Sequence, residues 1–158
     1  MELFGGLPYN TSLISFLTLI AYILLLLIGD CASGIPAARL LGRALQTLRF
    51  FAGGKGACMR LTLSDYAAAE ALPEHNTGIV NYALDLPAVE MAFLAEEREE
   101  ECKASLRAVS PRTVQVIAKK FGGGGHALAS GMRYDGPIEE MEKALIREMT
   151  AALAREEQ

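Results

Sequence analysis

The sequence is poor in the side chains that hold metal ions and covalent cross-links. Its 158 residues include three cysteines (Cys31, Cys58 and Cys102), two histidines and four aspartates. No Cys-x-x-Cys pair or Cys/His cluster occurs, which argues against a zinc site and against a disulfide framework. A dinuclear metal centre needs several carboxylate and imidazole ligands that converge. We therefore expect reduced, buried thiols and no metal or other cofactor bound by this chain.

The chain also lacks an excess of positive charge. Its formal net charge is −4 and its pI is about 5.2, which argues against a protein that coats nucleic acid non-specifically. A small basic pocket for a phosphorylated ligand is still compatible with this charge. With 51% hydrophobic and 22% charged residues, the chain can bury the core of one compact domain.

Charged residues are absent from a long apolar run, Leu13–Ile28. The run is shorter than the about 20 residues that a membrane-spanning helix usually needs, and no basic residue precedes it, as a signal peptide would require. Arg39 and Arg43 follow it and would hold the C-terminal side in the cytoplasm if the run entered a membrane. A membrane anchor and a buried helix are both open interpretations. A break follows, which divides the chain into an apolar N-terminal segment, 1–34, and a cytoplasmic domain, 35–158.

Beyond the break, helical and extended patterns alternate along the chain. Residues 102–109 alternate with period two, whereas apolar positions near the C-terminus recur at helical spacing. The expected strands are 50–52, 57–63, 88–95, 102–109 and 131–134, with turns at 53–56 and 96–101. The expected helices are 36–49, 64–71 with Ser64 as N-cap, 78–84, 110–121 opened by Ser110-Pro111, and one from Pro137 with the stripe Ile138, Met141, Leu145, Met149 and Leu153. This pattern predicts an α+β fold, a small mixed β-sheet flanked by helices, with an N-terminal apolar helix.

Four consecutive glycines followed by His126 form the most informative motif. Such a run costs backbone entropy, so a folded domain retains it where the main chain needs unusual dihedral angles or a very close approach. Successive N–H groups without neighbouring Cβ atoms can bind an anion, and a histidine adds a donor whose charge is tunable near neutral pH. A flexible linker or a simple helix stop is the alternative interpretation.

Arg107 is the second candidate for chemistry. It is expected to share a strand face with Lys103 and Ser105, so that three donors face one groove. A guanidinium binds a phosphate through two parallel hydrogen bonds, which an ammonium does not do. A solvated strand face is the alternative interpretation.

Three motifs follow one another along the chain, and two of them contain Arg107 and the glycine run. They are Thr77–Tyr82 (TGIVNY), Ser105–Arg107 (SLR) and Ile117–His126 (IAKKFGGGGH). In this order they resemble the C-terminal, DHH-associated domain of the DHH phosphoesterase superfamily, in particular its branch of bifunctional oligoribonucleases and pAp phosphatases (nanoRNases). The helix Ala38–Leu45 is similar to the segment that leads into that domain, and the resemblance covers residues 36–155.

The resemblance implies that two halves of the enzyme have different roles. In that family an N-terminal half holds two manganese ions with aspartates and a DHH motif, and the C-terminal half binds the nucleotide. By position, Arg107 would pair with a substrate phosphate, His126 would donate to it, and Ser105 would be a neighbouring contact. Backbone amides would come from the glycines Gly123, Gly124 and Gly125.

The sequence departs from the family because it contains no Asp-His-His tripeptide and no aspartate-rich N-terminal half. The resemblance therefore implies a domain that binds short RNA or a nucleoside phosphate, contributes no catalytic residue and does not hydrolyse its ligand alone. A fragment, a truncated reading frame, a domain with a separate DHH partner and a homodimer all fit, and whether the chain serves an enzyme stays open. The alternative is a membrane-tethered nucleotide-sensing or interaction module of the same fold, anchored by Leu13–Ile28.

Overall fold

The computed structural model describes residues 34–155. The chain divides into two compact units, Met1–Ile35 and Pro36–Gln158, and the fold belongs to the second. The expected apolar segment Leu13–Ile28 and its two interpretations lie outside the described residues. Within residues 34–155, no helix is long and apolar enough to cross a membrane.

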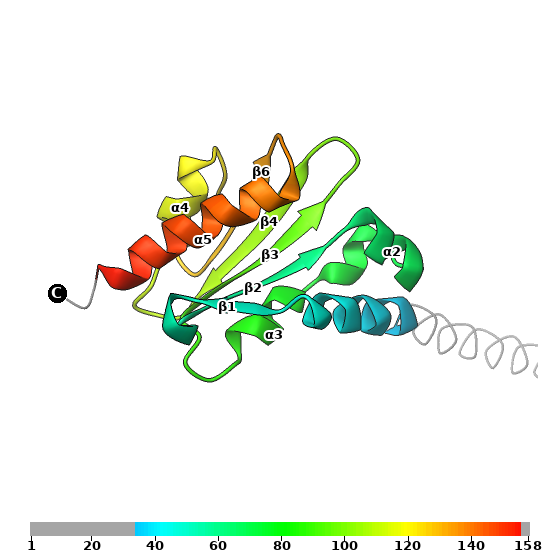
Figure 1. The fold of residues 1–158 in the computed structure, drawn as a ribbon, viewed down its shortest axis with the longest axis horizontal. Helices are drawn as coiled ribbons and strands as arrows, with labels where there is room; N and C mark the ends of the chain where they lie inside the picture. The colour runs from blue at the N-terminus through cyan, green and yellow to red at the C-terminus, as the bar shows by residue number, and fades with distance from the viewer. Residues whose placement is uncertain (1–33, 156–158) are drawn as a thin grey trace, which may run out of the picture. The chain divides into compact units, whose positions relative to one another are not determined.

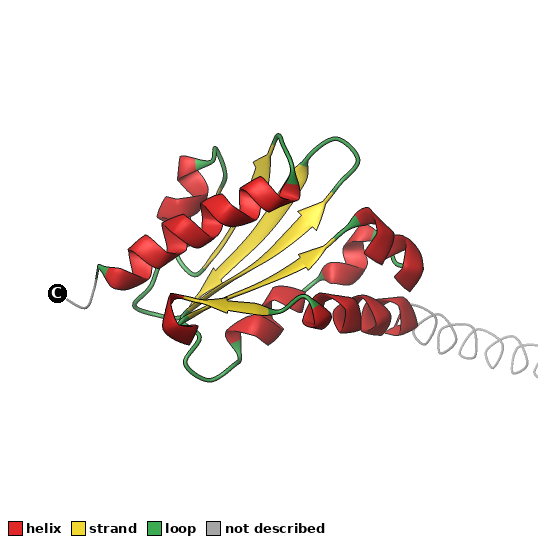
Figure 2. Cartoon of the chain, viewed as in Figure 1, coloured by secondary structure: helices red, strands yellow, loops and turns green. Residues whose placement is uncertain are grey.

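A six-stranded mixed β-sheet forms the centre of the domain, with helices on both of its faces (Figure 1; Figure 2). The strands lie in the order β1-β2-β3-β4-β6-β5; β2 pairs with β3 in parallel, and the other neighbours are antiparallel. Their bounds are β1 (Arg49–Phe51), β2 (Gly56–Leu61), β3 (Met91–Glu97), β4 (Cys102–Ala108), β5 (Gly124–Gly125) and β6 (Ala129–Tyr134). The α+β prediction is confirmed.

One face of the sheet packs against α5 (Ile138–Ala154) and α4 (Gln115–Lys120). The strands contribute every second side chain to this core, including Phe93 and Leu106. The α5 stripe predicted from helical spacing is confirmed, since all five of its positions are buried: Ile138, Met141, Leu145, Met149 and Leu153.

The opposite face of the sheet packs against three helices that precede β3. These are a helix over residues 34–46, α2 (Leu63–Ala69) and α3 (Ile79–Leu84). Their apolar side chains, Leu40 among them, form a second core with side chains of β2 and β3. Within the described domain, no residue of β4, β5 or β6 belongs to this second core, although α3 also contacts β4.

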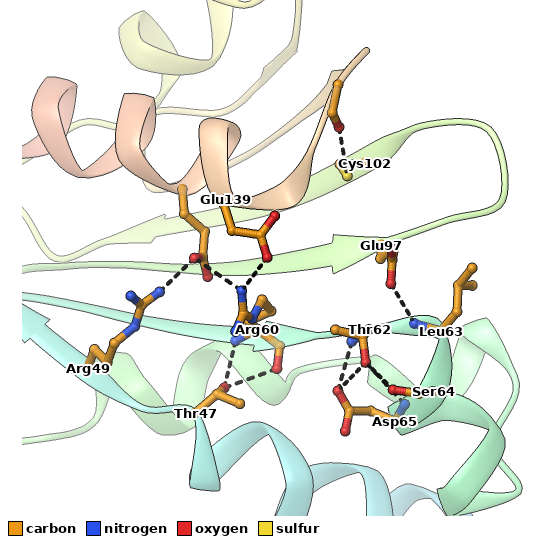
Figure 3. Close-up of polar contacts among 12 residues, drawn as sticks. Thr47, Arg49, Arg60, Thr62, Leu63, Ser64, Asp65, Glu97, Cys102 and Glu139 are labelled. Carbon is orange, nitrogen blue, oxygen red and sulfur yellow. Dashed lines mark hydrogen bonds and ion pairs between the residues drawn. The ribbon is translucent and has the colours of Figure 1, made fainter.

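The first of these helices is shorter than predicted. It ends at residue 46 rather than at Arg49, because Arg49 begins β1 and pairs in register with Cys58 of β2. Nη2 of Arg49 lies 2.7 Å from Oε2 of Glu142, a buried residue of α5. The same oxygen lies 3.8 Å from Nη1 of Arg60 (Figure 3). This ion-pair cluster joins β1 and β2 to α5, which helical periodicity could not reveal.

The predicted N-cap of α2 is wrong by two residues. Thr62 is the N-cap, since its Oγ1 accepts from the amide of Asp65 and the Asp65 carboxylate accepts from the amide of Thr62 (Figure 3). This reciprocal capping box satisfies two amide donors at once. Ser64 lies inside the helix and contacts the Thr62 hydroxyl at 2.8 Å. The helix ends at Ala69 instead of reaching residue 71.

The Ser110-Pro111 pair does not open α4, contrary to the prediction. The peptide bond between them is cis, and α4 begins at Gln115. Residues 110 and 111 form a turn, which the amide of Arg112 closes by donating to the carbonyl of Val109 at 2.9 Å, and the amide of Val114 donates to the carbonyl of Ala127 at 2.8 Å. That hydrogen bond attaches the start of α4 to the loop before β6.

Only part of the charged segment 96–101 is a turn, contrary to the prediction. Glu96 and Glu97 belong to β3, and the tight turn spans residues 98–101, where the amide of Arg98 donates to the carbonyl of Glu101 at 2.9 Å. Glu96 is fully buried. Its Oε1 accepts from the Tyr66 hydroxyl at 2.9 Å, and from Arg98 and Asn76.

Candidate functional site

Strand β4 has the predicted alternation of buried and exposed side chains. Its buried members face α5, whereas Lys103, Ser105 and Arg107 point to the opposite face. Lys103 is exposed, and the other two are half-buried. No residue of β4 belongs to the second core, so the three donors lie beside that core, on the strand that α3 also contacts. The prediction that they share one face is confirmed.

Arg107 differs from the other arginines in its surroundings. Each of the eight other arginines between residues 39 and 147 has a carboxylate oxygen within 4.0 Å. Among the described residues, no carboxylate pairs with Arg107, whose Nη1 donates to the carbonyl of the adjacent Leu106 at 2.9 Å. A half-buried guanidinium with most of its donors unused is a suitable partner for an anionic group.

The glycine run has clear structural roles at three of its four positions. Gly122 follows α4 with φ +73, a left-handed conformation that stops the helix. A Cβ on Gly123 would lie 2.3 Å from the carbonyl oxygen of Gly131, and one on Gly125 would lie 2.6 Å from that of Ala129. Close packing of the run against β6 therefore requires glycine at both. At Gly124 an added Cβ would meet nothing within 4 Å.

The amides of the run are not equivalent as donors. Gly122 and Gly123 donate to the Lys119 and Ala118 carbonyls at the end of α4. His126 and Ala129 exchange two backbone hydrogen bonds and so form a hydrogen-bonded pair. Hydrogen-bonded and non-hydrogen-bonded pairs alternate along an antiparallel ladder. The next pair, Gly125 and Ser130, is therefore non-hydrogen-bonded, and the amide of Gly125 points away from β6. The Gly125 carbonyl accepts from the Gln115 side chain at 2.7 Å, as expected for a residue facing outward at the sheet edge. Gly125 thus offers the amide best placed for a ligand.

The strand register places the candidate residues in two neighbouring rows, where a row is the set of residues that lie opposite one another on adjacent strands. Ser105 lies opposite Gly131 of β6, which lies opposite Gly124 of β5. One row further, Arg107 lies opposite Ala129, whose carbonyl accepts from the His126 amide at 2.8 Å. Neighbouring strands are about 4.8 Å apart, so the backbones of Arg107 and His126 are about 10 Å apart at the same end of the sheet. The His126 side chain is exposed.

A cavity of about 290 Å³ lies beside this row, at the edge of the sheet. Its walls include backbone of the glycine run together with Phe121, Lys103 and Arg133. Arg133, directly opposite Lys103 in the β4–β6 register, was missed by the sequence analysis. Arg133 lies two residues from Gly131 and therefore on the same strand face, which would have placed it beside Lys103 if the pairing of β6 with β4 had been known. Arg107, Ser105 and His126 do not line this cavity.

Three groups with shifted pKa values lie on β2 and α2, away from these rows. Burial raises the pKa of the Cys58 thiol to about 11, and burial beside Glu96 raises the pKa of Tyr66 well above its usual value. Burial opposes ionisation of Asp65, but hydrogen bonds from Thr62 and Arg43 outweigh it and lower the pKa of that carboxyl. Cys58 belongs to the core between the sheet and α5, and Asp65 and Tyr66 lie on α2.

His75 has a structural role in the described part of the chain. His75 lies in the short 3-10 helix Pro73–Asn76, and its Nδ1 accepts from the Leu72 amide at 2.9 Å, which is a capping role. Within the part of the chain that the structure describes, no three His, Cys, Asp or Glu side chains are placed to hold a metal ion. The residues present do not fit the dinuclear manganese site that the family resemblance implies for the other half.

Known proteins are similar to this chain over the same region. The DHHA1 domain model matches residues 73–155. The bifunctional oligoribonuclease and PAP phosphatase NrnA of Thermus thermophilus is 34% identical over 119 residues, which are 72% of this chain and 35% of that protein. This chain therefore spans about a third of the length of that relative.

Two solved structures share the fold. An exopolyphosphatase-related protein from Bacteroides fragilis is 27% identical with a TM-score of 0.68, over 73% of this chain and 35% of that one. The pGpG-specific phosphodiesterase PggH from Vibrio cholerae is 19% identical with a TM-score of 0.56, over 74% and 40% of the two chains, which shows likeness of fold alone. The family match covers more than half of the sequence and includes β4, the glycine run and β6. The chain belongs to the DHHA1 family, the DHH-associated domain of DHH phosphoesterases.

Proposed function

We propose that this domain binds the terminal phosphate of a nucleotide or a short oligoribonucleotide. Arg107 makes the main charged contact, and Ser105 and His126 donate from neighbouring positions. The glycine run supplies close backbone approach at Gly123 and Gly124 and an outward amide at Gly125. The observation that carries the proposal is the half-buried Arg107, which has no carboxylate partner among residues 34–155 although each other arginine from Arg39 to Arg147 has one.

The chemistry of the site favours binding over hydrolysis. Guanidinium, hydroxyl, imidazole and backbone amide groups stabilise an anion but do not activate water as a metal-bound hydroxide does. We infer that a separate DHH domain supplies the metal-dependent step, in line with the relative that acts as an oligoribonuclease and PAP phosphatase and is about three times as long as the matched region. The full chain incubated with Mn²⁺ and a short oligoribonucleotide is expected to release no mononucleotide.

Calorimetric titration of the full chain with AMP and with pAp tests the site. A hydrogen-bonded ion pair contributes about 1.5–3 kcal/mol, so Arg107→Ala should weaken binding about 10-fold to 100-fold. His126→Ala should weaken it by a smaller factor. Arg147→Ala is the matched control, because Arg147 is 78% exposed and lies on α5. Binding that both site variants leave unchanged would overturn the assignment, as would mononucleotide release by the chain alone.

A further inference from the structure

Two polar side chains hold the carbonyl groups on either side of the Cα atom of His126. Nε2 of Gln115 donates to the Gly125 carbonyl at 2.7 Å, and Oγ of Ser130 donates to the His126 carbonyl at 2.8 Å. Gln115 is the first residue of α4, and Ser130 is a buried residue of β6. Side chains from two different elements therefore hold the backbone at the end of the glycine run.

These hydrogen bonds complete the attachment of both peptide groups that flank His126. The amide of His126 donates to the Ala129 carbonyl at 2.8 Å, and the His126 carbonyl also accepts from the Ala129 amide at 3.2 Å. Because each peptide group is planar, holding both groups fixes φ and ψ of His126 and hence the direction of its Cα–Cβ bond.

The imidazole of His126 depends on this backbone attachment for its position. Its side chain is exposed, and within residues 34–155 the imidazole makes no hydrogen bond or ion pair. An exposed side chain without such contacts must be ordered when it binds a ligand, which lowers affinity. A fixed Cα–Cβ direction removes part of that cost before the ligand arrives.

Gln115 acts where the strand itself gives the least support. Strand β5 has two residues and lies at the edge of the sheet, with β6 as its neighbour. Gly125 and Ser130 form a non-hydrogen-bonded pair, so β6 gives the Gly125 carbonyl no donor. Glycine loses more conformational freedom on folding than any other residue. A hydrogen bond from α4 therefore has a large effect on the order of the backbone at this position.

We infer that Gln115 is a positioning residue of the proposed phosphate site, which acts through the Gly125 carbonyl to direct His126 toward the ligand. Ser130 holds the next peptide group in the same way. This inference rests on the proposed function and adds a residue of α4 to the site. A residue that served the fold alone would join α4 to β5 with no effect that depends on His126.

Calorimetry with AMP on the full chain tests the inference through a double-variant cycle. Gln115→Met keeps the length of the side chain and removes its donors. It should weaken AMP binding about threefold to tenfold, and by no more than His126→Ala does. In the His126→Ala background the same change should alter binding by less than about 1.5-fold, because the residue that it positions is gone. Gln46→Met is the matched control, since Gln46 is exposed at the end of the helix over 34–46.

Hydrogen exchange measured by NMR on the ligand-free chain gives a second test. The amide of His126 should exchange about threefold to tenfold faster in Gln115→Met than in the wild type, because the peptide group has lost one of its two hydrogen bonds. The amide of Leu145, in the core helix α5, should not change. Ser130→Ala should weaken AMP binding in the same direction, and it decides the matter if thermal unfolding shows that Gln115→Met is not folded.

The inference and the proposed function fail in different ways. If AMP binding depends neither on Arg107 nor on His126, the proposed function is wrong and the role of Gln115 falls with it. If both dependences hold but Gln115→Met binds AMP like the wild type, the inference is wrong and the proposed function stands. The same conclusion follows if Gln115→Met weakens binding by an equal factor with and without the His126 side chain.

Discussion

Alanine at Gly123 and at Gly124 should have opposite effects, although the two residues are adjacent. A Cβ on Gly123 would lie 2.3 Å from the Gly131 carbonyl oxygen and 2.7 Å from Cβ of Met132, where ordinary contact begins at 3.4 Å. The obstructing oxygen is backbone of β6, which β4 holds on its other side, so it cannot rotate away. A Cβ on Gly124 would meet nothing within 4 Å.

The expected magnitudes follow from these contacts. Overpacking of this kind costs about 1–3 kcal/mol, and the shift of β6 it demands puts Gly123→Ala near the upper end. For a domain of this size, about 4 °C of melting temperature is lost per kcal/mol, which predicts a decrease of about 10 °C. Gly124→Ala should stay within about 0.5 kcal/mol of the wild type, because replacing glycine at an unstrained position also restricts the unfolded chain.

Thermal unfolding followed by circular dichroism, together with AMP and pAp titrations, separates packing from binding. Gly124→Ala should melt like the wild type and bind both ligands more weakly, since the methyl group enters the cavity beside the glycine run. Equal melting temperatures for the two variants would refute the packing argument. Unchanged binding by a fully stable Gly124→Ala protein would show that the run serves packing alone.

Three further predictions concern the interior of the domain. Thr62→Ala should lower the free energy of unfolding by about 1 kcal/mol because it removes the capping box, while Ser64→Ala should cost less, a difference measurable by urea denaturation. Glu96→Gln should destabilise by about 1.5–3 kcal/mol because it removes the charge that Arg98 pairs with inside the protein, whereas Glu100→Gln, in the turn, should be neutral in the same assay. The Cys58 thiol has a folded pKa of about 11 against an ordinary value of 9.0, so its contribution to stability is complete below pH 9 and is lost as the pH rises from 9 to 11. Over that interval the wild type should lose about 2–3 kcal/mol more than Cys58→Ala, and equal losses would contradict the shift.

Local patterns predicted the parts of the fold that depend on neighbours in sequence. The period of two in β4 and the helical stripe of α5 both reflect which side chains one face can bury, and both are confirmed. The predicted hairpin around residues 53–56 is also present, as β1 paired with β2. In each case the deciding contacts repeat along the element, so a single sequence carries them.

Predictions failed where a distant segment changes a local preference. Ser64 and the Ser110-Pro111 pair both have good helix-starting chemistry, yet Thr62 caps α2 with Asp65, and the start of α4 is attached to Ala127. Glu96 looked like part of a solvated turn because its neighbours are charged. It is buried because Tyr66 and Asn76, 30 and 20 residues earlier, bring polar groups to it.

For the same reason, the sequence predicts the strand face of Arg107 but not whether a carboxylate pairs with it. Alternation predicts its strand face, but whether a carboxylate reaches it depends on the whole fold, since arginines here find partners far along the chain. Arg49 pairs with a glutamate 93 residues away, and Arg60 with one 79 residues away. With 19 acidic residues against 15 basic ones, a carboxylate partner is the ordinary outcome for an arginine. The lack of one at Arg107 within the described domain is therefore more informative than the motif around it, and it makes a ligand anion the expected counter-charge.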